Sequence, residues 1–471
     1  MTRASIGREA RGEVTSELLR RYDVAGPRYT SYPTAVEFGD GYTEATYRAK
    51  LAEANEQAEL PLSFYVHIPF CEERCSYCGC NVVITKKREV AARYLEYLQG
   101  EIDLLASCLP SRRGVSQLHW GGGTPTYLSV EQMEALHAKI AGHFEVAADA
   151  EVAIEIDPRV TTPEHVRSLR RLGFNRISMG VQDFSPQVQA AIGRHQTEAE
   201  TRALYEACRK LGFHSINLDL IYGLPHQTPE NFARSMEVVL DLRPDRLAVY
   251  SYAHVPWLKA HQKWIDERAL PPPSRKLRLF GIAREMLLEA GYEPIGMDHF
   301  ALPDDELVAA RQERRLHRNF MGYTVKAAGD MVGVGLTAVG DVQRSYAQNA
   351  KKLSTYYRAL DAGRFPIEKG RILDTDDRIR REVITRLMCN FALDRTAIEK
   401  RFGIDFGRYF ADELSELNGP DGPVGHGFLE IRPDRLEVVG HGRLFVRNIC
   451  MTFDRYRRDH PSGKRLFSAT V

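Results

Sequence analysis

The stretch that decides the fold of this chain is LSFYVHIPFCEERCSYCGC, residues 62–80. Its first part is an apolar run that predicts a strand over residues 62–70. A loop follows directly and carries Cys71, Cys75 and Cys78, with three and then two residues between them. Thiolates at this spacing can reach three corners of one compact cluster, because soft sulfur ligands favour iron–sulfur centres, zinc or copper(I). The stretch therefore predicts a strand that ends in a metal or redox site.

Outward from this stretch, short extended runs alternate with segments of helical period. Further strands are expected at residues 115–120, 151–156, 176–181, 214–221 and 246–252. Helices are expected at residues 90–109, 130–144, 163–172, 198–211, 229–242 and 274–290. Strands that alternate with helices of this length predict βα units around a parallel sheet. Six units make a partial barrel, since a complete (β/α)8 barrel has eight, and the extended run at 292–297 is expected to add an edge.

The ends of these strands carry polar or glycine-rich residues. Gly121-Gly122-Gly123-Thr124 follows the second strand, Glu155 lies at the end of the third, Gln182 follows the fourth, and Asp219 lies in the fifth. In α/β folds the functional sites lie at the carboxyl ends of parallel strands, where such side chains meet. This regularity predicts one active site at the top of the barrel.

Composition divides the chain into three parts. Residues 1–45 are expected to form a helix and an ordered arm, because the aromatic residues of GPRYTSYPTA (26–35) need a place to be buried. Residues 46–350 hold the expected barrel, and in residues 351–471 the strand pattern gives way to a helical one. The predicted fold class is α/β, a partial (β/α)6 barrel with an N-terminal arm and a smaller α-rich C-terminal domain.

The overall composition is that of a globular protein without a strong electric field. Of 471 residues, 43% are hydrophobic and 27% charged, and 64 Lys and Arg against 63 Asp and Glu leave a net charge of +1. These values exclude a disordered chain and do not indicate nucleic-acid binding. No stretch approaches the roughly 18 uninterrupted apolar residues of a spanning helix, and the first residues show no signal or transit pattern. We expect a cytoplasmic protein with no nucleic-acid partner and no membrane insertion.

The eight cysteines are too few for a disulfide scaffold. The four outside residues 71–80 are expected to be buried small apolar residues: Cys108, Cys208, Cys389 and Cys450. A structural zinc site is the alternative for the clustered four. Zinc sites usually add a second pair of ligands about 12–20 residues away, which this sequence lacks, and four ligands in one loop would crowd Cys78 and Cys80. A purely structural metal is the less favoured interpretation.

The C-x3-C-x2-C motif behind a first strand resembles that of the radical S-adenosylmethionine (SAM) superfamily. Longer blocks, between residues 24 and 454, resemble one family within it, the oxygen-independent coproporphyrinogen III dehydrogenases. Among these blocks are QLHWGGGTPTYL (117–128), NLDLIYGLPHQTPE (217–230) and GRLFVRNICMTFD (442–454). Cys80 and the arm sequence are similar to that family and distinguish it from the related radical-SAM haem chaperones.

The resemblance implies the cofactors. Cys71, Cys75 and Cys78 would hold a [4Fe–4S] cluster that leaves one iron free to bind SAM, and Cys80 would lie near the cluster but outside its ligand set. Two SAM molecules are implied, and no catalytic side chain beyond the cluster and the SAM site. The family's SAM contacts correspond to Tyr65, Tyr77, Gly122, Gly123, Thr124, Glu155, Gln182, Arg194, Asp219, Ala253 and Val339. Acidic side chains among them suit ribose hydroxyls or an ammonium, and the arginine suits a carboxylate.

The resemblance also implies the reaction. Two propionates of coproporphyrinogen III would lose CO2 and become vinyl groups, giving protoporphyrinogen IX, after a 5′-deoxyadenosyl radical takes a β-hydrogen from each. An external electron donor would reduce the cluster, an external acceptor would take an electron from the substrate, and the chain would act as a monomer. Basic residues should face the propionates, with Arg28, Arg194 and Arg318 as candidates, and Asp298 beside His299 is a candidate for pyrrole N–H groups. Each of these arginines could equally be a solvated side chain.

Other functions share parts of this pattern. The main alternative is a haem carrier of the same fold, which binds haem and delivers it while SAM cleavage stays unproductive. A zinc-stabilised module without catalysis and a haem-degrading methyltransferase are further alternatives with less support from the motifs. Cys80, the arm and the C-terminal domain favour the dehydrogenase over the haem carrier.

Overall fold

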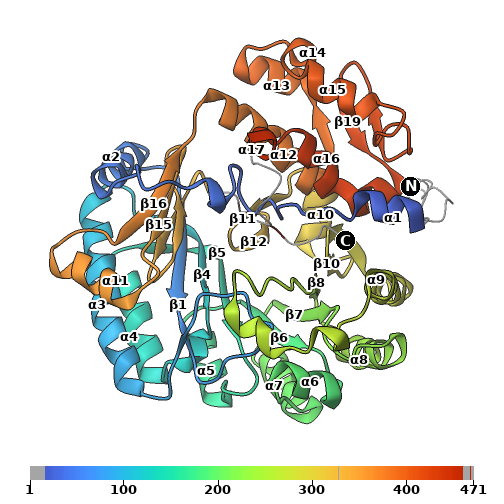
Figure 1. The fold of residues 1–471 in the computed structure, drawn as a ribbon. Helices are drawn as coiled ribbons and strands as arrows, with labels where there is room; N and C mark the ends of the chain where they lie inside the picture. Colours follow the sequence, from blue (N-terminus) through green and yellow to red (C-terminus); the bar gives the residue numbers. More distant parts are fainter. Residues whose placement is uncertain (1–15, 327, 460–466, 468–471) are drawn as a thin grey trace.

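One sheet of twelve strands runs through the structure, a computed structural model that describes residues 16–326, 328–459 and 467. Its strand order is β16-β15-β14-β13-β1-β4-β5-β6-β7-β8-β10-β9. The central strands run parallel to one another: β1 (Leu62–Ile68), β4 (Gly114–Gly122), β5 (Glu145–Ile156), β6 (Arg176–Gln182), β7 (Ser215–Tyr222) and β8 (Arg246–Ser251). Figure 1 shows that this part of the sheet is curved and carries helices on its outer side. The predicted partial (β/α)6 barrel is confirmed.

Helices cover the outer side of these strands (Figure 1). They are α3 (Arg88–Cys108), α4 (Val130–Ala141), α5 (Pro163–Arg171), α6 (Pro186–Ile192), α7 (Glu198–Lys210), α8 (Pro229–Leu242) and α9 (Pro273–Glu289). Four of them open with a capping box, in which the N-cap side chain and the third helical residue satisfy each other's backbone N–H: Ser129, Thr162, Thr197 and Thr228. Helix α6 was not expected, because seven residues are too few to show a helical period.

The side chains of the central strands alternate between two environments. Phe64, Val66 and Ile68 of β1 are fully buried in the main apolar core. Ser63 points to the other face, where its Oγ donates to Gln117 Oε1 of β4 at 2.9 Å. Because successive side chains of a strand point to opposite faces, the barrel has an apolar outer face and a polar inner one. The polar inner face is the setting of the candidate site.

Both edges of the sheet extend beyond the six central strands. Beside β1 lie β13 (Asp330–Val334), β14 (Val339–Asp341), β15 (Ser345–Asn349) and β16 (Ile367–Ile372). Beside β8 lie β10 (His299–Ala301) and β9 (Glu293–Gly296), so the extended run expected at 292–297 forms an edge as predicted. The boundary expected at residue 350 falls inside the sheet, because β15 pairs with β16. Helix α11 (Leu353–Asp361), between these two strands, packs on α3.

The C-terminal part has its own apolar core and is rich in helices, as expected. Its helices are α12 (Thr375–Asn390), α13 (Arg395–Phe402), α14 (Phe406–Tyr409), α15 (Ala411–Asn418), η5 (Gly440–Phe445), α16 (Val446–Thr452) and α17 (Arg455–Asp459). A small antiparallel sheet of β17 (Ala392–Asp394), β19 (Arg435–Val438) and β18 (Leu429–Ile431) completes it. Val383, Leu387, Phe406 and Ile449 are among the side chains of this second core.

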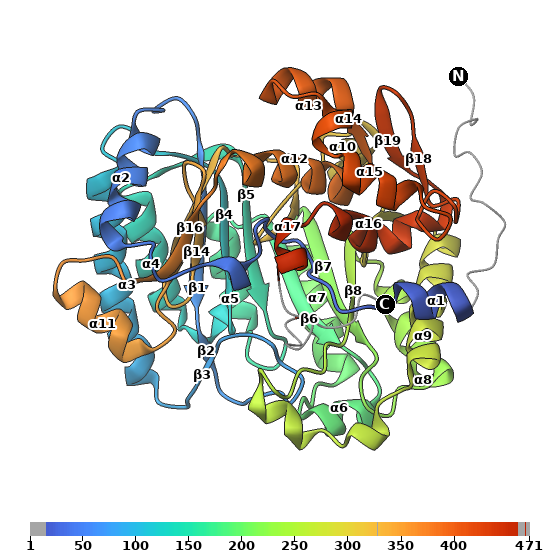
Figure 2. The ribbon, with the colours of Figure 1, turned by 45° about the horizontal axis from the view of Figure 1, so that its top comes forward.

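The N-terminal arm joins the two parts. Helix α1 (Ser16–Tyr22) precedes it, η1 (Ala35–Glu37) lies within it, and α2 (Glu44–Asn55) follows. Figures 1 and 2 show the blue arm running between the sheet and the orange and red C-terminal part. Tyr29 and Tyr32 are buried in the second core, which confirms that the arm is ordered because its aromatic residues are packed. The part of the expected N-terminal helix in residues 1–15 lies outside the described residues.

Short elements complete the fold around the barrel. They are β2 (Phe70–Cys71), β3 (Val83–Ile84), η2 (Pro125–Tyr127), η3 (Ala260–Trp264), η4 (Glu267–Ala269), α10 (Glu306–Gln312) and the hairpin of β11 (His317–Asn319) and β12 (Gly322–Thr324). The hairpin reaches the inner face, because Asn319 Nδ2 donates to Gln117 Oε1 at 3.2 Å. Within the described ranges, no helix combines the length and the apolar character needed to cross a membrane.

Candidate active site

The loop with three cysteines is held rigidly at the carboxyl end of β1. Cys71 ends β2, directly beyond β1, and Cys75 is buried, while Cys71 and Cys78 are half-buried. The backbone N–H of Cys78 donates to Cys75 O at 3.2 Å, and that of Ser76 donates to Ile192 O of α6 at 2.9 Å. The loop is therefore fixed both to itself and to the helix after β6.

Each thiol has a different neighbour. Cys71 Sγ lies 3.5 Å from Thr124 Oγ1, at the end of the glycine run. Cys75 Sγ accepts from Arg159 Nη2 at 3.6 Å and from Arg194 Nη1 at 3.9 Å. Two guanidinium groups thus place positive charge beside the sulfur of Cys75, which suits a thiolate ligand.

The other thiols differ in protonation. Burial raises the pKa of Cys71 to about 11. A hydrogen bond from the Cys80 thiol lowers the pKa of Cys78 to about 6, and the backbone N–H of Cys80 also donates to Cys78 Sγ, at 3.4 Å. Cys80 thus donates hydrogen bonds to a cysteine of the motif, and its place outside the ligand set stays a prediction.

The arrangement of the thiols fits a cluster better than a single ion. A tetrahedral zinc site needs every sulfur about 2.3 Å from one point, whereas the ligands of a [4Fe–4S] cluster bind different irons. Three thiols on one loop are soft donors of the kind that hold such a cluster, and the arginines beside Cys75 place positive charge next to one of them.

The glycine run after β4 is shaped by its close approach to the cysteine-bearing segment. Gly122 has φ +121°, and a Cβ there would lie 2.7 Å from the His67 ring. A Cβ at Gly123 would lie 2.8 Å from the backbone of Pro69 and Phe70. The N–H groups of Gly123 and Thr124 donate to Ile68 O and Phe70 O at 2.8 and 2.9 Å. A side chain at Gly123 would displace the backbone that leads into the cysteine loop, and one at Gly122 would strain the backbone and collide with the His67 ring.

Two acidic residues on the inner face differ in their electrostatics. Glu155 accepts from the Gly122 N–H at 3.1 Å and lies 3.5 Å from His119 Nε2. Burial opposes its charge, but these two hydrogen bonds outweigh burial and hold the pKa of Glu155 below its usual value. At Asp219 burial prevails and raises the pKa to about 7, although Ser178 Oγ and Asn217 Nδ2 donate to it at 2.9 and 2.8 Å.

Arg194 is the most deeply held charge of the site, with 5% of its surface exposed. Its Nη1 donates to Asp157 Oδ2 at 3.0 Å and its Nη2 to Gly180 O at 2.6 Å. Its Nε is buried and has no hydrogen-bond partner, so it can donate to an anionic ligand. Gln182, which has φ +70°, lies beside Arg194. Both side chains pack against Gly180: a Cβ there would lie 2.9 Å from Gln182 Nε2 and 3.3 Å from Arg194 Nη2.

The remaining expected SAM contacts lie around these groups. Tyr65 stacks on His119, and its hydroxyl lies 3.0 Å from His67 Nδ1. Tyr77 and Ala253 are brought together by the amide of Gln262, which donates to their carbonyl oxygens at 2.9 and 3.2 Å. Val339 begins β14, and its carbonyl oxygen lies close to Gly333, which is paired with Tyr65 on β1; its side chain packs against the apolar cluster that includes Phe38 and Tyr346.

Sequence reasoning missed several residues of this site. Asp157 binds both Arg194 and Arg159 and so fixes the two guanidinium groups at Cys75. It lies directly after the last residue of β5, and this place at the carboxyl end of a parallel strand was the available signal. Of the four scattered cysteines, Cys208, Cys389 and Cys450 are buried as predicted. Cys108 is only half-buried, and its sulfur accepts from Arg48 at 3.4 Å.

A second polar group lies where the arm meets the barrel. Arg28 forms an ion pair with Asp298, which also accepts from His299 Nδ1 at 2.8 Å. Arg318 Nη1 donates to Arg28 O at 2.9 Å. The structure thus brings together two of the three arginines expected to face propionates and places Arg194 apart from them, at the cysteine loop.

Next to Arg318 lies a cavity of about 520 Å³ between the arm, the hairpin β11–β12 and α12. It is lined by six arginines, Arg318, Arg344, Arg378, Arg381, Arg386 and Arg401, and by two acidic residues, Asp341 and Glu382. Asp341 pairs with Arg381, and Glu382 pairs with Arg386 and Arg401 at 2.9 and 2.8 Å. Six positive charges against two negative ones leave the cavity suited to an anion with several carboxylates.

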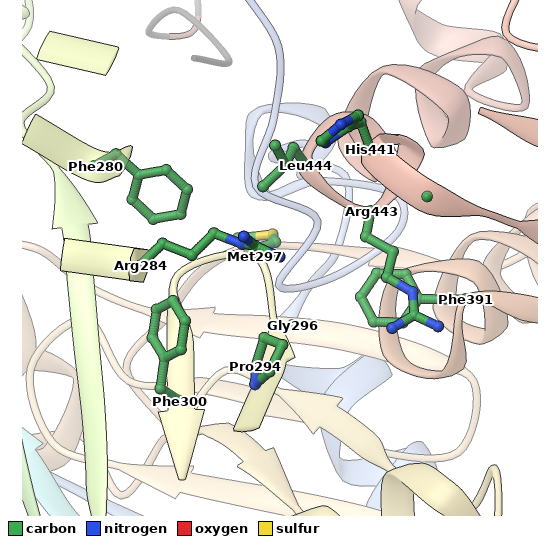
Figure 3. A pocket seen from close by; sticks show the side chains of 11 residues that line it. Phe280, Arg284, Pro294, Gly296, Met297, Phe300, Phe391, His441, Arg443 and Leu444 are labelled. Carbon is green, nitrogen blue, oxygen red and sulfur yellow. The ribbon is translucent and has the colours of Figure 1, made fainter. Parts of the chain in front are cut away.

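A smaller pocket lies at the interface with the C-terminal part (Figure 3). Phe280 and Arg284 of α9 form one side, His441 and Leu444 of η5 form the other, and Met297 lies between them. Its volume is about 40 Å³, room for little more than a water molecule. This pocket is a gap in the interface and not a cofactor site.

With this geometry established, the chain can be compared with known proteins. Residues 65–239 match the Radical SAM superfamily and residues 373–445 match the HemN C-terminal domain. The oxygen-independent coproporphyrinogen III oxidases of Pseudomonas aeruginosa and Escherichia coli are each 46% identical to this chain, over 94% of it and 95% of their own length. The solved structure of coproporphyrinogen III oxidase (HemN) from Escherichia coli, a radical SAM enzyme, matches with a TM-score of 0.87 at 45% identity and covers 91% of this chain and 97% of that one.

The fold, the three-thiol loop and these matches define a radical SAM enzyme. At this identity and coverage, the chain belongs to the family of oxygen-independent coproporphyrinogen III oxidases, which are oxidoreductases. Membership implies a [4Fe–4S] cluster and SAM as its cofactors, in agreement with the donor set at the cysteine loop. The family expected from the sequence blocks is confirmed.

Proposed function

We propose that this chain converts coproporphyrinogen III to protoporphyrinogen IX by oxidative decarboxylation of two propionates, without oxygen, in porphyrin and haem biosynthesis. The observation that best supports this function is the three-thiol loop at the carboxyl end of β1, in a chain that also gathers Arg28 and Arg318 where the arm meets the barrel. The relatives that carry this activity in their names align with nearly the whole chain.

The cysteines are proposed to bind the cluster, and the other site residues are proposed to bind SAM. A cluster held by Cys71, Cys75 and Cys78 would supply, together with SAM, a 5′-deoxyadenosyl radical. The protein's part is to hold and orient the cofactor. The free Nε of Arg194 suits the methionine carboxylate, and Glu155, kept charged by His119 and Gly122, suits an ammonium or ribose hydroxyls.

We also propose that two SAM molecules bind. The expected contacts fall into two groups on the inner face, which supports the proposal. Tyr65, Gly122, Gly123, Thr124 and Glu155 lie on the side of β1, β4 and β5, whereas Gln182, Arg194 and Asp219 belong to β6, β7 and the loop after α6. Equilibrium dialysis of the reconstituted protein should give two SAM per chain, and saturation at one would contradict this part of the proposal.

The substrate's carboxylates are proposed to bind at Arg28, Arg318 and the arginine-lined cavity. Strand β1 connects the two regions, since Ser63 lines the cavity and His67 lies beside the glycine run. From Ser63 to His67 the strand spans about 13 Å, a distance comparable to the width of a tetrapyrrole. A macrocycle held by its carboxylates at the cavity could therefore bring another propionate toward the SAM site.

The protein also has to keep water and oxygen away from the reacting propionate. The arm and the hairpin β11–β12 provide the cover: Arg28 binds Asp298 beside β8, and Asn319 binds Gln117 on the inner face. Excluding water strengthens the electrostatic contacts inside and protects reactive intermediates. Asp298, held charged by Arg28 and His299, is proposed to face pyrrole N–H groups.

An anaerobic turnover assay tests this function. The reconstituted protein receives SAM, a chemical reductant, coproporphyrinogen III and an electron acceptor, and the products are separated by chromatography. Protoporphyrinogen IX and 5′-deoxyadenosine, both absent with Cys75→Ala, are the expected result. Haem binding without any vinyl product, from protein that contains a [4Fe–4S] cluster, would show instead a haem carrier.

The setting of the enzyme is part of the proposal. We propose that it works as a monomer in the cytoplasm, with an external electron donor and an external acceptor and without a nucleic-acid partner. The near-neutral net charge of +1 supports the absence of a nucleic-acid partner. Sedimentation at micromolar concentration should give one species of 53.4 kDa.

A further inference from the structure

The loop that contains η3 exposes large apolar side chains beside the cysteine motif. The chain has three tryptophans, and Trp120 is fully buried. The other two lie on this loop, with Trp257 48% and Trp264 66% exposed, and Leu258 between them is 57% exposed. Exposed apolar clusters of this kind mark interaction sites, because each such side chain would be more stable if covered. We call Trp257, Leu258, Lys259, Lys263 and Trp264 the η3 patch.

The η3 patch is held in place by the backbone of the cysteine loop. His261 Nε2 lies 2.8 Å from Cys78 O, and Lys259 Nζ donates to Cys80 O at 3.4 Å. Gln262 is buried beneath the patch and its side chain binds three backbone groups, Val255 N at 2.6 Å and the carbonyls of Tyr77 and Ala253. Figures 1 and 2 both show this yellow-green segment beside the blue loop that follows β1. A molecule seated on the patch would therefore lie against the segment that carries Cys78 and Cys80.

The charges of the η3 patch indicate which kind of surface can bind to it. Lys263 is exposed and forms no ion pair with any described residue, and Lys259 binds only a backbone oxygen. The nearby acidic residues are already paired, Asp266 with Arg268 at 2.9 Å and Glu267 with His254 at 3.1 Å. The unpaired charge at the patch is therefore positive. An acidic surface with apolar side chains at its centre is the complementary partner.

We infer that the η3 patch is the docking surface for a small acidic redox protein that delivers single electrons to the cluster. The inference rests on the proposed function, which consumes an electron for each SAM cleaved. In the delivery step the reduced partner loses one electron and the cluster gains one, and no bond is made or broken. The partner's acidic face pairs with Lys259 and Lys263, its apolar centre covers Trp257 and Trp264, and its redox group then lies next to the backbone of Cys78.

Electron delivery by two different reductants tests this inference on the reconstituted full chain. The protein probe is a reduced plant-type ferredoxin of net negative charge, whose potential near about −400 mV suits a strong reductant. The chemical reductant is dithionite, which needs no docking surface. We expect Lys263→Glu and Trp264→Ala each to lower kcat/KM for ferredoxin at least tenfold. Turnover with dithionite, iron content and SAM binding should stay as in the wild type.

Matched controls come from exposed residues far from the cysteine loop. Lys400→Glu on α13 and Ile372→Ala on β16 change the same types of exposed side chain and should leave both reactions unaltered. Ferredoxin rates that fall with rising salt in the wild type, and less steeply in Lys263→Glu, would add support.

Several outcomes would overturn the docking site. It would be overturned if Lys263→Glu and Trp264→Ala both left kcat/KM for ferredoxin unchanged. It would also be overturned if these variants lowered turnover equally with ferredoxin and with dithionite. Sedimentation of the wild type with anionic phospholipid vesicles, lost in Trp264→Ala while ferredoxin rates stay the same, would show that the patch binds a membrane instead. If the wild type gave no turnover with dithionite, the proposed function itself would be contradicted. That result differs from a loss confined to the ferredoxin reaction of the patch variants, which concerns the docking site alone.

Discussion

Arg28 of the N-terminal arm forms an ion pair with Asp298, a residue 270 positions further along the chain. Asp298 directly precedes β10, so the arm is attached to the edge of the barrel by a charged contact. Burial opposes the charge of Asp298, but Arg28 and His299 outweigh it and hold the pKa of this carboxyl well below its usual value. The pair therefore stays charged at neutral pH and keeps the arm closed.

Arg28→Gln should lower the free energy of unfolding by about 2 kcal/mol, because a largely buried hydrogen bond between charged groups is lost. Denaturation in urea measures the change. Arg268→Gln, which removes an exposed pair with Asp266, is the control and should leave the midpoint where it is. If Arg28→Gln behaves like this control, the arm is held by its tyrosines alone.

Cys75→Ser should abolish cluster assembly, because the cluster then loses one of its three sulfur ligands and a serine oxygen is a poor substitute for a thiolate. Iron and acid-labile sulfide per chain measure the loss. Cys80→Ser should retain at least most of the iron, since Cys80 contacts the motif only through Cys78. The same loss in both variants would place Cys80 in the ligand set.

Arg194→Lys should weaken SAM binding about tenfold or more, because hydrogen bonds to charged groups contribute about 1.5–3 kcal/mol. A lysine cannot serve Asp157, Gly180 O and a ligand with the fixed geometry of a guanidinium. Calorimetric titration with SAM gives the dissociation constant. Arg170→Lys on α5, whose Nε donates only to Leu211 O, is the control and should bind SAM normally.

SAM binding should depend on pH through Asp219, whose pKa is raised to about 7 by burial. As pH rises through about 7 the carboxyl becomes charged and accepts hydroxyl hydrogen bonds more strongly. SAM affinity should therefore increase between pH 6 and pH 8, and Asp219→Asn should remove the increase. The raised pKa of Asp219 affects the free energy of unfolding in the opposite direction. Its stabilising contribution is fully present below about pH 3.8 and is lost as the pH rises through about 7.

Arg344→Gln and Arg378→Gln should raise KM for coproporphyrinogen III several-fold and change kcat little, because both line the cavity with no acidic partner among the described residues. Binding of fluorescent coproporphyrin III to the protein gives a second readout that needs no turnover. Arg358→Gln on the exposed face of α11 is the control. An unchanged affinity in the cavity variants would place the carboxylates elsewhere.

The central sheet was predictable because each strand is one apolar run between turn residues. The outer strands β13 to β16 were not, because they are only three to six residues long and three of them contain glycine. They join the central sheet through β13, whose pairing with β1 joins segments more than 250 residues apart, and local patterns do not encode such a contact. The same limit explains why the domain boundary was drawn at residue 350, inside the sheet.

In the candidate site too, features set by local sequence were predictable and features set by long-range contacts were not. The cysteine spacing and the glycine run are local patterns, and the sequence shows them directly. The positions of Arg194 and Asp157 at Cys75 and of Gln262 between Tyr77 and Ala253 depend on the closed sheet, which brings distant segments together. Val339 was carried over from the family; its backbone lies close to Gly333, the strand partner of Tyr65, and its contact with SAM stays a prediction.

The arm depends on a residue made near the end of synthesis. Arg447 of α16 is buried and donates to Pro27 O at 3.1 Å and to Gly26 O at 2.6 Å, with 420 positions between the partners. At about 5–20 residues per second, the arm leaves the ribosome roughly 20–80 s before Arg447 exists to hold it. During that interval the barrel is already translated but its cover is not yet fastened. The order of synthesis therefore requires the barrel to be translated before Arg447 can hold the arm.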